Sequence, residues 1–166
     1  MDTTQDFRDF VVHAHPRLLR AAYLLTGNQH DAEDLAQTAL VKAGLAWRRI
    51  QRVDNPDAYV RRVLVNTHIS RWRTRSRRGE KLTADPPSRP VVDVELGRCE
   101  DRDQLRAALA SLSPRQRAAV VLRYHEDLSV EETASLLDCT QGTVKTLTSR
   151  ALAKLRTHLE PQCATT

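Results

Sequence analysis

A proline-rich stretch near the middle of the chain is the feature that most limits how this sequence can fold. Between Gly79 and Arg98, three prolines and two glycines interrupt a chain that elsewhere shows helical spacing. Proline lacks the backbone N–H that helices and central strands use, and polar Pro-rich stretches are typical of partly extended linkers. The sequence therefore predicts two small domains, over residues 1–78 and 101–160, with a linker over 79–100 and a tail over 161–166.

The spacing of apolar residues predicts an all-α fold made of two small helical domains. Apolar side chains recur at intervals of three and four residues from Phe7 to Leu25, and again from Ala32 to Ala43. That interval places them on one face of a helix. Aromatic residues make up only 4% of the chain and glycine is rare, so the composition favours helices packed with Leu, Val and Ala over a β-sandwich.

In the first half, residues with strong terminal preferences indicate where helices end and begin. Gly27 is expected to stop the first helix, and a second helix is expected to open at Asp31. Asn55 followed by Pro56 predicts the start of a third helix, because asparagine caps helices and proline suits their first position.

The second half contains two capping boxes. Ser113 with Gln116, and Ser129 with Glu132, have the spacing in which each side chain bonds the other residue's backbone. Thr140 is expected to cap the last helix. The predicted helices cover 105–112, 114–124, a short stretch after Ser129, and 141–159.

The charge of the chain points to an anionic partner. The formal net charge is +5 and the sequence pI is near 9.5, which favours nucleic acid or an anionic membrane surface without specifying a fold. No apolar run approaches the roughly 20 residues that a membrane-spanning helix needs. The amino-terminal residues are polar and acidic rather than a signal peptide, and the three cysteines have no metal-ligand spacing. We expect a cytoplasmic protein without a membrane partner, metal or cofactor.

A dense basic run, RWRTRSRRGEK at residues 71–81, begins at Arg71 within the third predicted helix. It is typical either of a solvated helix end or of a surface that binds phosphates. Arginines at alternate positions spread around a helix, so only some of them can contact one DNA strand at a time.

Residues 129–156 have the sequence form of a helix-turn-helix. A small residue, Ala134, suits the place where the two helices meet, and Leu137 and Val144 suit their packing. Polar and basic residues at the start of the second helix form adjoining strips that could lie in the major groove of DNA. The alternative for this stretch is a plain helical hairpin with a solvated face.

Both halves resemble one protein family, the extracytoplasmic-function (ECF) sigma factors of the sigma-70 family, in an actinobacterial-like form. The stretch LSPRQRAAVVLRYHEDLSVEETASLLDCTQGTVKTLTSRALAKLR is similar to sigma region 4. DAEDLAQTALVKA and NPDAYVRRVLVNTHISRWRTRSRR are similar to two parts of region 2. The resemblance implies a non-enzymatic factor that binds core RNA polymerase at the β′ clamp helices and β flap. It also implies −10 and −35 promoter recognition, melting of the −10 element, and an anti-sigma factor as a further partner.

The resemblance carries roles to particular positions. Residues expected to dock on polymerase are Asp31, Glu33, Asp34, Gln37 and Leu40. Residues expected at the −10 element are Ile50, Arg52, Asn55, Arg62, Asn66, Ser70, Arg71 and Arg73, with Asn66 contacting an unstacked base. Residues expected at the −35 element are Gln141, Thr143, Lys145, Thr146, Ser149 and Arg150. This chain departs from the family at Thr146 and Leu147, where a serine and an arginine are common, so its −35 sequence preference stays open.

Two other functions are compatible with parts of the sequence. A helix-turn-helix regulator with an amino-terminal sensing or dimerisation domain would explain residues 105–160, but not the acidic helix at Asp31 or the basic helix after Pro56. An enzyme acting on nucleic acid would need paired carboxylates or metal ligands among basic residues. The acidic residues lie instead at helix starts and in the predicted linker.

Overall fold

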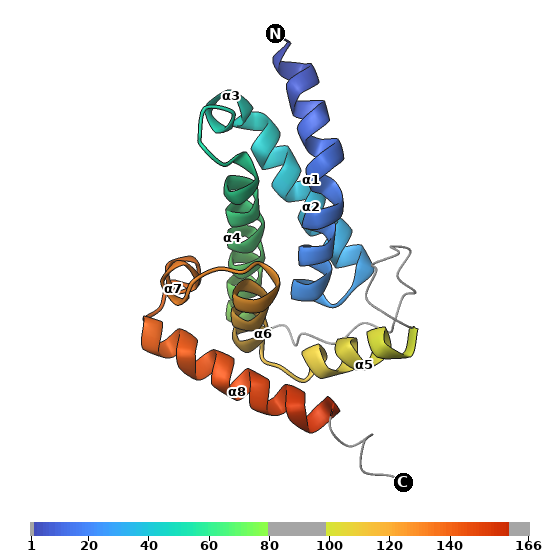
Figure 1. The fold of residues 1–166 in the computed structure, drawn as a ribbon, viewed down its shortest axis with the longest axis vertical. Helices are drawn as coiled ribbons and strands as arrows, with labels where there is room; N and C mark the ends of the chain where they lie inside the picture. Colours follow the sequence, from blue (N-terminus) through green and yellow to red (C-terminus); the bar gives the residue numbers. More distant parts are fainter. Residues whose placement is uncertain (1, 80–98, 160–166) are drawn as a thin grey trace. The chain divides into compact units, whose positions relative to one another are not determined.

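The computed structural model describes residues 2–79 and 99–159, and every regular element in these two ranges is a helix (Figure 1). The predicted all-α fold is thereby confirmed. The first range contains α1 Thr3–Thr26, α2 Gln29–Leu45, α3 Trp47–Ile50 and α4 Pro56–Arg77. The second contains α5 Cys99–Ala110, α6 Pro114–Val120, the π-helix η1 Val121–His125, α7 Val130–Leu137 and α8 Gln141–Leu159.

The chain divides into two compact units, residues 1–88 and 89–166. The boundary between these units, most of the predicted linker and the predicted tail lie outside the described residues. At the amino-terminal edge of the linker, α4 ends at Arg77 and Gly79 has a φ of 68°. This left-handed conformation suits glycine and ends the helix there.

The caps explain where the first two helices end and begin. Gly27 has a φ of 74°, and its N–H donates to the carbonyl of Tyr23, so it stops α1 as predicted. α2 begins at Gln29, two residues before the predicted Asp31. The reason is Asn28, whose side chain accepts from the Asp31 N–H at 3.1 Å and so caps the helix earlier. Asn55 caps α4 as predicted, accepting from the Ala58 N–H at 3.1 Å.

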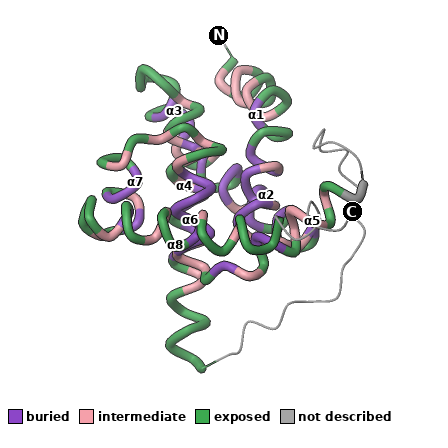
Figure 2. The backbone as a smooth tube through the Cα atoms, turned by 60° about the horizontal axis from the view of Figure 1, so that its bottom comes forward, coloured by how far each residue is buried: buried purple, intermediate pink, exposed green. Residues whose placement is uncertain are grey.

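In the N-terminal unit, α2 packs against both α1 and α4, and its contact faces are lined with alanine. Figure 2 shows the buried residues of α2 and α4 as purple stretches of the backbone tube. Trp47 on α3 is buried against two rings of α1, with centroid distances of 5.2 Å to Phe7 and 4.9 Å to Phe10. A Cβ atom at Gly44 would approach the Phe7 ring to 3.0 Å, so this glycine permits the close approach of α1 and α2.

The C-terminal unit has both predicted capping boxes. The side chain of Ser113 bonds the Gln116 N–H, and that of Ser129 bonds the Glu132 N–H, with the reciprocal bond present in each pair. α8 packs against α5, α6 and α7, and its buried residues Val144 and Ala151 face them.

Two helix boundaries in this unit differ from the prediction. α5 covers Cys99–Ala110 instead of 105–112, because its first turns are charged and have no apolar period to reveal them. The helix predicted to run to Tyr124 is α-helical only to Val120 and continues as a π-helix to His125. The Glu126 N–H bonds the Val121 carbonyl at 3.0 Å, five residues back, which is the π-type pattern.

The Ser129 capping box generates a stability prediction. Replacing Ser129→Ala should lower the free energy of unfolding by about 1 kcal/mol, because the Glu132 N–H at the start of the short helix α7 loses its side-chain acceptor. Urea unfolding followed by circular dichroism measures this. Ser135→Ala, at an exposed position inside the same helix, is the matched control and should leave stability near that of the wild type. Equal effects of the two substitutions would contradict the assigned role of the cap.

Candidate nucleic-acid interface

The turn between α7 and α8 has the geometry of a helix-turn-helix. Asp138 ends α7 in the left-handed conformation, with a φ of 53°, and the Cys139 N–H bonds the Ala134 carbonyl at 3.1 Å. The Thr140 hydroxyl oxygen then accepts from the Thr143 N–H at 3.1 Å and caps α8. The residues predicted to pack the two helices, Ala134, Leu137 and Val144, are all buried.

Polar side chains cover the outer side of the first three turns of α8. Five of the six residues predicted to read the −35 element are exposed and the sixth, Thr143, is half-buried; the exposed ones are Gln141, Lys145, Thr146, Ser149 and Arg150. We call these five the α8 strip. Leu147, where the family that the sequence resembles commonly has arginine, is half-buried, so this position offers little side chain to a ligand. The α8 strip combines two cations with amide and hydroxyl groups, the side chains that contact phosphates and base edges.

A second strip lies on α4. Arg62, Asn66, Ser70 and Arg73 are exposed and follow one another at intervals of four, four and three residues. These intervals place them along one side of the helix. We call them the α4 strip. It brings together four of the eight residues predicted at the −10 element.

Arg71, also predicted at the −10 element, lies elsewhere on α4. It is half-buried, and its guanidinium forms an ion pair of 2.7 Å with Asp34 on α2. A residue predicted to bind DNA and a residue predicted to bind polymerase are therefore paired with each other.

The loop before α4 offers fewer contacts than predicted. The Ile50 side chain is 0% exposed, so it is a core residue and cannot contact a base from this conformation. Arg52 and Asn55 are exposed, but the Asn55 side-chain oxygen is used to cap α4. Across the loop, Arg49 donates to the Tyr59 hydroxyl at 2.8 Å, a contact that ties α3 to α4.

On α2, the predicted docking residues divide between surface and core. Glu33, Asp34 and Gln37 are exposed and Asp31 is half-buried, whereas Leu40 is 8% exposed and packs in the core. We therefore leave Leu40 and Ile50 out of the candidate surfaces.

Sequence reasoning missed two exposed apolar residues on α2. Val41 is 56% exposed and Leu45 is 87% exposed, and their spacing places them on the same side as Asp34 and Gln37. We call these four residues the α2 strip. The sequence did contain a signal for them, because both residues lie outside the apolar stripe of alanines that α2 buries. An apolar residue outside the core face of a helix is a candidate for contact with a partner protein.

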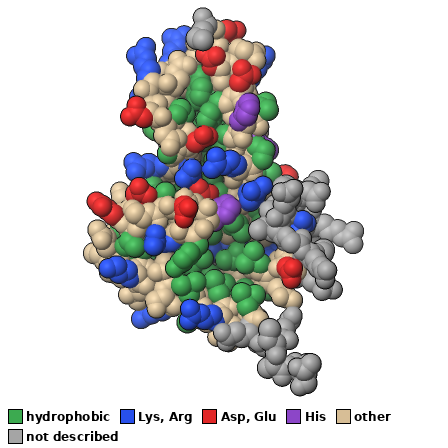
Figure 3. Space-filling view, viewed as in Figure 1, with side chains coloured by type: hydrophobic (Ala, Val, Ile, Leu, Met, Phe, Trp, Pro, Cys, Tyr) green, Lys and Arg blue, Asp and Glu red, His purple; other side chains and the backbone are tan. Residues whose placement is uncertain are grey.

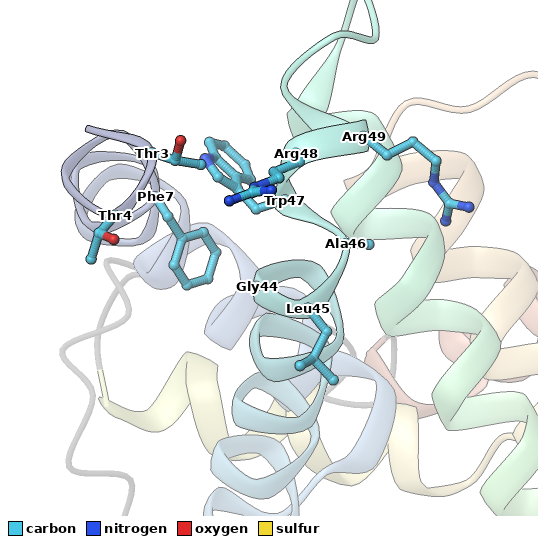
Figure 4. Close-up of a pocket in the computed structure, with 9 residues that line it drawn as sticks. All are labelled: Thr3, Thr4, Phe7, Gly44, Leu45, Ala46, Trp47, Arg48 and Arg49. Atoms are coloured by element: carbon cyan, nitrogen blue, oxygen red, sulfur yellow. The ribbon is translucent and has the colours of Figure 1, made fainter. Parts of the chain in front are cut away.

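The carboxyl end of the α2 strip borders an open pocket of about 590 Å³ at the junction of α1, α2 and α3. Figure 4 shows Phe7 of α1 near Gly44 and Trp47, with the Arg48 side chain beside Trp47 and the side chains of Leu45 and Arg49 pointing away from Phe7. An apolar side chain beside a pocket with basic residues on its border suits contact with a protein surface.

Charged side chains elsewhere on the described residues are mixed in sign and form no metal site. On the face drawn in Figure 3, basic and acidic side chains are interspersed, so the net charge of +5 is not gathered into one patch there. Within residues 2–79 and 99–159, no group of three or more His, Cys, Asp or Glu side chains is placed to hold a metal ion. No helix in these ranges is both long enough and apolar enough to cross a bilayer.

Comparison with known proteins identifies the two units. Residues 10–78 match the family Sigma-70 region 2, and residues 102–155 match Sigma-70, region 4. The chain is 41% identical over 155 residues to the RNA polymerase sigma-E factor of Streptomyces avermitilis. This alignment covers 93% of this chain and 86% of that relative. It is 36% identical over 159 residues to the ECF RNA polymerase sigma factor SigE of Mycolicibacterium smegmatis, covering 91% of this chain and 61% of that relative.

A solved structure extends the likeness to the fold. The sigma factor RpoE, in complex with the anti-sigma factor NepR from Bartonella quintana, is similar with a TM-score of 0.73 and 28% identity over 95% of this chain and 98% of that chain. Two matched regions in this order, together with relatives that align over more than 90% of its length, show that this chain belongs to the ECF group of sigma-70 family RNA polymerase sigma factors.

Proposed function

We propose that this sigma factor carries out promoter-specific initiation through the three helix strips described above. The α2 strip docks on the β′ clamp helices of core RNA polymerase, the α4 strip holds the −10 element, and the α8 strip reads the −35 element. Residues 1–78 form the docking and −10 domain. Residues 101–160 form the −35 domain, which also meets the β flap.

The observation that carries this proposal is the presence of two exposed polar and basic strips on two separate helical units, one on α4 and one on α8. A regulator that used only its helix-turn-helix would have no need of the α4 strip. In vitro transcription with purified core polymerase tests the proposal. We expect promoter-dependent transcripts that require this chain, whereas a DNA-bound homodimer that binds no polymerase would support the alternative regulator.

The proposal includes the chemistry of initiation. Within it the chain has no catalysis of its own, since the polymerase makes the RNA and the sigma factor supplies contacts to DNA. Extruding a base from the −10 element costs a few kcal/mol of stacking, which contacts from Asn66 must offset. We place the protein in the cytoplasm, with its polymerase. The likeness to an RpoE bound by NepR supports an anti-sigma factor as a further partner.

The α4 strip generates the first functional prediction. Asn66→Ala should lower the rate of open-complex formation about tenfold or more, because a polar contact to an extruded base is lost. Binding to core polymerase should stay within about twofold of wild type, since Asn66 lies outside the α2 strip. Fluorescence assays of promoter opening and of holoenzyme assembly measure the two quantities. Ser76→Ala, exposed further along α4, is the control, and unchanged opening in Asn66→Ala would remove this residue from the proposal.

The α8 strip generates the second functional prediction, on binding to the −35 element. Lys145→Ala and Arg150→Ala should each weaken holoenzyme binding to DNA that contains a −35 element. For a phosphate contact, the slope of log K against log salt should fall by about one. Titrations over a salt series check this. Arg156→Ala is the matched control, because six residues place it about 9 Å beyond Arg150 along the helix. Equal losses for all three variants would argue against a localised strip.

The α2 strip generates the third functional prediction, on binding to core polymerase. Leu45→Ser should weaken the binding of core polymerase by about tenfold, because an exposed leucine loses its contact with a protein partner. Its 87% exposure means that the free energy of unfolding should hardly change. Val12→Ser, at an exposed valine of α1, is the control for loss of surface hydrophobicity. Wild-type polymerase affinity in Leu45→Ser would place the docking surface elsewhere.

A further inference from the structure

A set of polar contacts joins α2 to α4 in the N-terminal unit. The Arg71 Nη1 donates to Asp34 Oδ2 at 2.7 Å, and its Nη2 donates to Thr38 Oγ1 at 2.8 Å. The Thr38 hydroxyl in turn donates to the Asp34 carbonyl at 2.8 Å. Because its proton is used in that bond, the Thr38 oxygen is free to accept from the guanidinium. Both terminal nitrogens of the Arg71 guanidinium are therefore bound to α2.

A second contact continues the same line. Lys42 Nζ donates to Thr67 Oγ1 at 3.0 Å. Lys42 lies one turn after Thr38 on α2, and Thr67 lies one turn before Arg71 on α4, so the contacts follow one another along two antiparallel helices. We call these contacts the α2–α4 clamp; its residues are Asp34, Thr38, Lys42, Thr67 and Arg71.

The clamp lies away from the α4 strip. Nine residues separate Arg62 from Arg71, and at 3.6 residues per turn this separation is about two and a half turns. Arg71 therefore projects from the side of α4 roughly opposite to Arg62. When Arg71 is bound to α2, the α4 strip is turned towards the solvent.

The clamp restricts orientation more than it adds stability. The side chains of Arg71 and Asp34 are 36% and 58% exposed, and ion pairs with this exposure contribute little to folding. A planar guanidinium held at two points nevertheless allows only a narrow range of geometries. Rotation or sliding of α4 on α2 would break the Asp34 and Thr38 contacts together.

We propose that Arg71 is a positioning residue for promoter opening, and that the clamp sets the rotation of α4 so that Asn66 faces the −10 element. This inference rests on the proposed function of the α4 strip. It gives Arg71 a role different from that of Arg73, which is exposed on the strip and suited to phosphate contact. It also explains why an arginine is used where lysine would supply the same charge.

Thr38 provides the sharpest test, because it belongs to the clamp but to none of the three strips. We expect Thr38→Val and Arg71→Gln each to slow open-complex formation by about two- to tenfold, the range for one lost polar contact. The double variant, with both Thr38→Val and Arg71→Gln, should open promoters no more slowly than Arg71→Gln alone. Both substitutions disrupt the same contacts of the Arg71 guanidinium with α2. The salt slope of promoter binding should match wild type in both single variants, and the affinity for core polymerase should match wild type in Thr38→Val, which changes no charge next to the α2 strip.

Thr74→Val is the matched control. Like Thr38, Thr74 donates to the carbonyl four residues earlier, at 3.0 Å to Ser70, but within the described residues its side chain makes no hydrogen bond to α2. Assays well below the unfolding temperature of each free variant exclude simple loss of folded protein. We expect Thr74→Val to open promoters at the wild-type rate.

Three results would overturn the proposal. A salt slope lowered by about one in Arg71→Gln, with wild-type opening in Thr38→Val, would make Arg71 a phosphate contact. Equal loss of polymerase binding and promoter opening in Thr38→Val would indicate a general structural role. Opening slowed as much by Thr74→Val as by Thr38→Val would remove the clamp from the explanation. Failure of the wild-type holoenzyme to initiate at all would instead refute the proposed function, so the two failures are distinguishable.

Discussion

The packing of α2 against α1 and α4 is the contact on which the N-terminal unit depends. Ala32, Ala36, Ala39 and Ala43 are all fully buried on α2, and such small side chains let neighbouring helices approach closely. Because this face of α2 is buried in the core, the opposite face is exposed and carries the α2 strip. The same packing leaves the opposite side of α4 open to a ligand, and the α2–α4 clamp holds α4 in that orientation. The α2 strip and the α4 strip therefore follow from one arrangement of three helices.

In the C-terminal unit, the ends of the helices determine which side chains are exposed. α7 has only two turns, too short to be stable by itself, and its start is held by the Ser129 capping box. Its end is set by Asp138 in the left-handed conformation, and Thr140 immediately caps α8. The direction of α8, and so of the side chains that it presents, is decided within these few residues.

Local signals allowed much of this to be predicted. The caps at Asn55, Ser113 and Ser129 were correct because a capping side chain bonds backbone only two or three residues away. The start of α5 was missed because its charged first turns bury no periodic apolar face. The burial of Leu40 and Ile50 was also missed, since a resemblance transfers positions along the chain without the orientation of each side chain.

By itself, the sequence determined the all-α class, most helix ends, the helix-turn-helix and the family, because these depend on spacings within a few turns of chain. Tertiary structure decided which side chains of each helix are free to bind. Leu45 is exposed because no helix within residues 2–79 covers its side of α2, and Arg71 meets Asp34, 37 residues earlier, because α4 packs on α2. Contacts between residues so far apart in sequence depend on how whole helices pack, which no local spacing specifies.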